Sequence, residues 1–152
     1  MSIKATPVIT TGIHEEIGRA VIDQLKPEYE VIHLALLSNV ENELPFLLKN
    51  QAPPSPSSSL GTGNWDSPPR AILFGGGYTD EIISRLQELA ASTEGARQIP
   101  WLRVDAAKVG LTPGSPEFII AITKKFKAEL ERLKTEGRLE DDGKDHGGVV
   151  WV

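Results

Sequence analysis

Short apolar runs that favour β-strands alternate with helical patterns along this chain, and the alternation limits the folds open to it. The first run, residues 7–12, ends in glycine and is followed by apolar residues at helical spacing, which predicts a strand, a tight turn and a helix. Similar runs predict further strands at residues 29–37, 70–77, 98–105 and 147–152. Residues 31–37 are almost continuously apolar, as is typical of a strand covered on both faces in a parallel sheet.

Amphipathic helices are expected between these strands. The helical spacing of apolar residues predicts them at residues 13–26, 79–92 and 115–137. The last helix is the best defined, since Ser115 can cap it, Pro116 suits its first turn and Gly137 can end it. The succession predicts an α/β fold, a small Rossmann-like or flavodoxin-like three-layer sandwich with a mainly parallel sheet of four or five strands. A strand order of 2-1-3-4 would make the turns after the first and third strands neighbours.

Length and composition are those of one globular domain, residues 1–152, with 39% hydrophobic and 24% charged residues. The chain has no cysteine, which excludes disulfides and thiolate metal sites. A net charge of −5 without a concentrated basic face argues against nucleic acid as a partner. No run approaches the roughly 20 apolar residues of a membrane span, and no signal-peptide core is present, so a cytoplasmic protein without a membrane partner is expected.

Two segments fall outside the alternation. Residues 38–50 are ambiguous, and Pro45 favours a short helix that begins there and covers residues 45–49. Residues 51–69 are rich in Pro, Ser and Gly and have no periodicity, which is typical of either a mobile surface loop or a lid. Trp65 in this loop is a candidate ligand-binding residue, because an aromatic between polar residues suits a segment that folds back onto a site.

The turn at residues 10–18, TTGIHEEIG, resembles the nucleotide-binding turn of the short-chain dehydrogenase family. Four residues match that pattern: Thr11, Gly12, Ile17 and Gly18. The resemblance covers residues 8–25 and implies an NAD(P) site to which Gly12, Ile13 and Gly18 would contribute. Glu16 stands where the family has its middle glycine, which lets the backbone approach the cofactor pyrophosphate.

Glu15 and Glu16 would stabilise the first turn of the helix by roughly 0.3–1 kcal/mol each, but they repel a pyrophosphate there. The family's catalytic Tyr and Lys, four residues apart, are also missing, since His33 follows Tyr29 and Ile82 follows Tyr78 at that spacing. We therefore expect a degenerate nucleotide-binding turn, no cofactor and no dehydrogenase activity, with NAD(P) as the disfavoured alternative.

A broader resemblance covers nearly the whole chain. Its motifs lie at residues 17–33, 58–83, 99–105 and 142–152. In these segments the chain is similar to a group of short fungal proteins described as hypothetical or Rossmann-like. The resemblance implies the fold and a fungal source, and it implies no reaction.

Candidate site residues gather where the expected strands end, because ligands of open parallel sheets bind at the carboxyl ends of the strands. Gly75, Gly76 and Gly77 indicate close approach by either a ligand or a neighbouring loop, and they are candidate ligand-binding residues. His14 lies in a turn beside carboxylates, where it could act as a general acid or base. The candidate catalytic residues are His14, Glu16, Tyr78 and Asp105.

The other two histidines are not candidate catalytic residues. His33 lies in an apolar strand, which predicts a hydrogen-bonded core residue. His146 follows several aspartates in the C-terminal segment, and these residues could hold a metal or form a solvated acidic tail. Their spacing fits no calcium loop, so no metal site is predicted.

Two functions follow from the sequence. The first is a Rossmann-like protein that binds a small molecule through a degenerate turn and forms a homodimer that buries either residues 149–152 or the long C-terminal helix. The alternative is a cofactor-independent isomerase or lyase, in which His14 and nearby carboxylates move protons.

Overall fold

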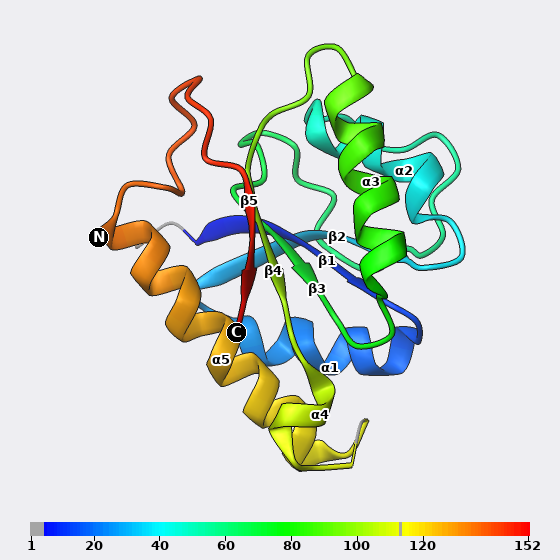
Figure 1. Cartoon of the computed structure of the whole chain (residues 1–152), viewed down its shortest axis with the longest axis vertical. Helices are drawn as coiled ribbons and strands as arrows, with labels where there is room; N and C mark the ends of the chain where they lie inside the picture. The colour runs from blue at the N-terminus through cyan, green and yellow to red at the C-terminus, as the bar shows by residue number, and fades with distance from the viewer. Residues whose placement is uncertain (1–4, 113) are drawn as a thin grey trace.

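The computed structural model describes residues 5–112 and 114–152, and these residues build a sheet of five parallel strands (Figure 1). The strands are β1 Thr6–Gly12, β2 Tyr29–Leu36, β3 Ile72–Phe74, β4 Pro100–Arg103 and β5 Gly148–Trp151. Their order is β2-β1-β3-β4-β5, and each neighbouring pair is parallel. This confirms the α/β class, with the C-terminal segment as the fifth strand, and the first four strands have the order 2-1-3-4 that makes the turns after β1 and β3 neighbours. The order is that of flavodoxin-like folds, so the protein is a small Rossmann-like or flavodoxin-like domain.

Helices cover both faces of the sheet and complete the three layers. α1 (Glu15–Leu25) and α5 (Pro116–Thr135) pack on one face, while α2 (Val40–Leu48) and α3 (Asp80–Ser92) pack on the other (Figure 1). Alternate side chains of each strand enter opposite faces, as the pleat of a strand requires. Val8 thus packs with the α1–α5 layer, and its neighbour Ile9 packs with the α2–α3 layer.

The connection from β4 through α5 to β5 has the opposite hand to the connection from β3 through α3 to β4. Both connections move across the sheet in the same direction, yet α3 lies on one face and α5 on the other. About 98% of such parallel crossovers share one hand. The exception places α5 beside α1, and the candidate site described below depends on that contact.

The helix predicted at residues 45–49 is longer in the structure and contains the proline. α2 begins at Val40, and Pro45 lies inside it. Without an N–H, Pro45 cannot donate to the carbonyl of Glu41, which weakens the helix. Leu44 and Leu47 are each only 1% exposed, and their burial against the sheet offsets that loss. α4 (Ala106–Val109), a single turn that Asp105 caps, has no counterpart among the helices predicted from the sequence.

The loop at residues 51–69 covers the outer edge of β2. The backbone N–H of Thr62 donates to the Val31 carbonyl at 2.9 Å, and that of Gly63 donates to the Ile32 carbonyl at 2.9 Å. The Ser58 hydroxyl donates to the carbonyl of Leu34. These contacts satisfy backbone groups that an open sheet edge would expose. At the other edge lies β5, whose Trp151 ring is 54% exposed.

No helix within residues 5–112 and 114–152 combines the length and the apolar character that crossing a bilayer requires.

Candidate ligand-binding site

A cavity of about 360 Å³ lies between α1 and α5, at the carboxyl ends of β1 and β3. This is the point at which the strand order reverses, where open α/β sheets bind their ligands. Its apolar walls are Ile17 and Val21 from α1, Leu34 and Leu73 from the sheet, and Phe118, Ile122 and Phe126 from α5. The polar residues that line it are Thr10, Thr11 and His14.

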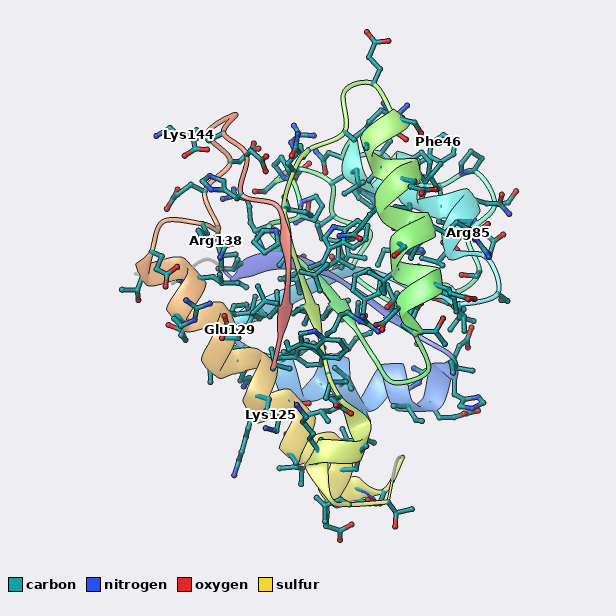
Figure 2. The ribbon with its side chains drawn as sticks, in the orientation of Figure 1. Phe46, Arg85, Lys125, Glu129, Arg138 and Lys144 are labelled. Carbon is teal, nitrogen blue, oxygen red and sulfur yellow. The ribbon has the colours of Figure 1, made fainter. Side chains whose placement is uncertain are left out.

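The amphipathic pattern of α5 explains why this helix forms a wall. Ser115 caps it by accepting a hydrogen bond from the Phe118 N–H, and Pro116 occupies its first turn, as predicted. Lys125 is exposed on the surface of α5 (Figure 2), whereas its neighbour Phe126 is 2% exposed and faces the sheet.

Gly18 lets α1 pack closely on the sheet at the cavity wall. A Cβ atom there would lie 2.5 Å from Leu34 Cδ2, well inside contact distance. In nucleotide-binding turns the last glycine serves the same close helix–strand packing. Gly18 therefore has a structural use that needs no bound cofactor.

The glycines after β3 accommodate a neighbouring loop. The Gly75 N–H donates to the Thr11 carbonyl at 3.1 Å, and a Cβ on Gly75 would lie 3.1 Å from that same oxygen. Gly77 has a φ of +95°, and a Cβ there would overlap Ile13 Cδ1. Of the two readings that the sequence left open, close approach by the chain itself accounts for Gly75 and Gly77.

Acidic residues surround the helix N-termini near the cavity. The first turn of α1 carries Glu15 and Glu16, and the first turn of α3 carries Asp80 and Glu81. The amide ends of helices attract phosphates, and carboxylates at those positions oppose them. The nearest buried cation, Arg103, is already engaged, since its guanidinium lies 2.8 Å from Asp80 and donates to the Tyr78 carbonyl.

Seven of the predicted site residues line the cavity: Gly12, Ile13, His14, Gly18, Gly75, Gly76 and Gly77. His14 occupies the cap position of α1, makes no capping hydrogen bond and is exposed. Within the described part of the chain it is the only titratable side chain in the lining.

The remaining candidates lie elsewhere. Glu16 is exposed on α1 and outside the lining, and Asp105 caps α4 by accepting from the Ala107 N–H at 3.1 Å. Tyr78 packs edge-on against Phe74 in the α2–α3 layer, 5.1 Å between ring centroids. Burial raises the pKa of Tyr78 to about 12, so its phenol is protonated at neutral pH. The expected grouping of His14 with these residues is therefore not formed.

Trp65 is also displaced from its expected position over the crevice. Its side chain packs against the α2–α3 layer, and its carbonyl accepts a hydrogen bond from Asn50 Nδ2 at 2.9 Å. Hydrogen bonds with β2 hold the loop at the sheet edge. In this structure residues 51–69 cover an edge and form no lid.

A buried polar cluster lies on the α2 side of β2. His33 Nε2 is 2.6 Å from Glu43 Oε1, and the Ser57 hydroxyl donates to Glu43 Oε2 at 2.5 Å. His33 is 7% exposed and Glu43 is 1% exposed. The prediction that His33 is a hydrogen-bonded core residue is confirmed, but the sequence had not identified its partners.

The acidic C-terminal segment is held by local contacts. His146 Nε2 lies 2.8 Å from Asp142 Oδ1, and the Gly147 N–H donates to Asp145. Among the described residues no group of three or more His, Asp or Glu side chains is arranged to hold a metal ion.

No protein-family model and no solved structure matches this chain. It is similar to a protein of Aspergillus oryzae named Kojic acid related protein 6, with 36% identity over 140 residues. The match covers 90% of this chain and 82% of that protein. The chain belongs to the Kojic acid related protein 6 family.

Proposed function

We propose that this protein binds a small molecule in the cavity between α1 and α5 and has no NAD(P)-dependent dehydrogenase activity. The observation that carries the proposal is the cavity itself, about 360 Å³ at the point where the strand order reverses. Mostly apolar walls with a few polar groups are typical of small-molecule sites, which span roughly 300–1,000 Å³.

A thermal-shift screen of neutral small molecules tests this binding. Kojic acid belongs in the screen because the name of the Aspergillus oryzae relative refers to it. A ligand at 100 times its Kd stabilises the folded state by about 2.7 kcal/mol, which raises the Tm of a domain of this size by roughly 5–10 °C.

The matched variants are Ile122→Trp, which fills the cavity, and Ile120→Trp, which places the same ring on the exposed side of α5. A ligand of the cavity should raise the Tm of the native protein and of Ile120→Trp. The Tm of Ile122→Trp should be the same with and without the ligand. Equal shifts in all three proteins would place the binding elsewhere and contradict the proposal.

We expect NADH and NADPH to show no micromolar binding to the native protein by calorimetry. Glu15 and Glu16 repel a pyrophosphate at the start of α1, and the Ile13 side chain already packs on Gly77. Charge removal alone, in the double variant Glu15→Gln with Glu16→Gln, should restore little binding while Ile13 remains. Heat release with a micromolar Kd in the native protein would refute this prediction.

An isomerase or lyase is the second candidate, favoured by the position of His14 in the cavity lining. Because Glu16, Tyr78 and Asp105 lie outside that lining, His14 would act without the expected carboxylate partners. Mass spectrometry of each screening hit after incubation tests the candidate. Conversion by the native protein that His14→Ala abolishes would favour an enzyme, and unchanged hits favour binding alone.

We also propose that two copies of the chain associate through β5. This strand forms the sheet edge opposite the covered edge of β2, and it carries the exposed Trp151. Open edges pair readily with other strands, and a lysine on an edge opposes such pairing. Light scattering should therefore report a dimer for the native protein and a monomer for Trp151→Lys. A native monomer throughout a concentration series would rule out the dimer.

A further inference from the structure

Thr10, which lines the cavity, has a buried hydroxyl without a hydrogen-bond partner among the described residues. Thr10 lies in β1 and is 3% exposed. Buried hydroxyls are nearly always hydrogen-bonded, because leaving one unpaired destabilises the folded state.

Neighbouring threonines show the usual pattern. Thr11 Oγ1 donates to the Leu73 carbonyl at 3.4 Å, and Thr123 Oγ1 donates to the Ile119 carbonyl at 2.7 Å. Both side chains are almost as buried as Thr10 and satisfy their hydroxyls within the chain. Thr10 differs from them because its hydroxyl has no acceptor among the described residues, and a molecule bound in the cavity that Thr10 lines can supply the missing partner.

The surroundings of Thr10 limit the charge of such a molecule. The side chains in the lining are apolar apart from two threonines and His14, and no described Lys or Arg side chain contributes to it. Glu15 and Glu16 stand in the first turn of α1, just beyond His14. An anion would lose its hydration in this space and face carboxylates, with no fixed cation to compensate.

We propose that the cavity takes an uncharged molecule with an apolar body and one hydrogen-bonding group, and that this group pairs with the Thr10 hydroxyl. The inference rests on the proposed small-molecule function and specifies the ligand class. The apolar walls from α5 bind the body of the molecule, and Thr10 fixes its orientation from the β1 side. Few polar groups at fixed positions within an apolar pocket give orientation and specificity in this way.

Three bicyclic probes of matched shape test the ligand class by fluorescence titration: 2-naphthol, naphthalene and 2-naphthoate. In the native protein 2-naphthol should bind about tenfold more tightly than naphthalene, the factor of one net hydrogen bond. The 2-naphthoate anion should bind more weakly than either. Thr10→Val replaces the hydroxyl with a methyl group of similar shape and should abolish the preference for 2-naphthol while leaving naphthalene binding unchanged.

The controls separate this inference from the proposed function. Thr10→Ser keeps the hydroxyl and should keep the preference, and Thr123→Val removes a satisfied hydroxyl outside the lining and should change neither affinity. Equal affinities for 2-naphthol and naphthalene, both lost in Ile122→Trp, would overturn the role of Thr10 and leave the binding function standing. Tightest binding of 2-naphthoate would overturn the uncharged class. Failure of all three probes to bind, or undiminished binding in Ile122→Trp, would overturn both.

Discussion

Replacing Glu43 with alanine should lower the free energy of unfolding by about 2–6 kcal/mol, since each of the two buried polar groups left without an acceptor costs about 1–3 kcal/mol. The substitution leaves His33 Nε2 and the Ser57 hydroxyl without their shared acceptor inside the protein. It also removes a contact between β2, α2 and the loop at residues 51–69. Urea unfolding followed by circular dichroism measures the loss, which corresponds to a fall in Tm of roughly 10 °C.

Glu41→Ala is the matched control on the same helix. Glu41 pairs with Arg85 at the surface, where both side chains are about half exposed, and exposed pairs contribute about 0–1 kcal/mol. A double-mutant cycle between His33 and Glu43 should give a coupling of about 1 kcal/mol or more. If Glu43→Ala proves as stable as Glu41→Ala, the buried cluster contributes nothing to the fold.

The same cluster should make stability depend on acidity. Burial alone raises the pKa of a carboxyl, but hydrogen bonds from His33 and Ser57, with the charge of His33, hold the pKa of Glu43 below its ordinary value of 4.5. A lowered folded-state pKa contributes stability that is complete above the unfolded value and is lost as the pH falls through the folded value. The native urea midpoint should therefore fall more steeply below pH 4.5 than that of Glu43→Gln, which has no carboxyl to protonate there. Parallel profiles would exclude Glu43 as the cause.

The spacing of apolar residues and the helix caps predicted most of the fold, because the residues that they mark as apolar are the ones that the tertiary structure buries. The apolar run of β2 and the cap and stripe of α5 correspond to buried surfaces in the structure. The prediction failed where tertiary contacts override a local rule. Pro45 stops a helix in isolation, but the burial of Leu44 and Leu47 carries α2 through it. The partner of His33 could not be predicted either. Glu43 lies in residues 38–50, whose structure the sequence left ambiguous, and it reaches His33 only because α2 forms there.

Only the part of the candidate site formed by the turns at the strand ends could be predicted from the sequence. Strand order brings the turn at residues 12–14 beside Gly75, as the order 2-1-3-4 considered from the sequence would require. The wall that α5 provides could not be foreseen, because it depends on a crossover whose hand is rare. The apolar stripe of α5 was visible in the sequence, but no local signal says which face of the sheet it covers. Thr10 gave no signal either, since an unpaired hydroxyl is a property of the packed structure.

Gly61→Ala should release the loop at residues 51–69 from the edge of β2. Gly61 has a φ of +107°, and a Cβ there would overlap the Ile32 carbonyl oxygen and lie 2.7 Å from His33 Cα. Backbone strain costs about 1–3 kcal/mol, and overpacking adds about 1–3 kcal/mol. The neighbours are backbone atoms of β2, which its pairing with β1 holds in place, so the loop must move instead. The hydrogen bonds of Thr62 and Gly63 with β2 would then be lost.

Gly63→Ala separates this overlap from the cost of an unusual φ alone. Gly63 has a φ of +68° and open space around its Cβ position, so its substitution should cost only about 1 kcal/mol of strain. Limited proteolysis should cut Gly61→Ala within residues 51–69 much faster than the native protein or Gly63→Ala, with a Tm lower by roughly 10 °C. The exposed β2 edge should also make Gly61→Ala aggregate on heating, because an uncovered strand pairs with other chains. Equal cleavage rates in the two variants would mean that the loop is not held at β2 through Gly61.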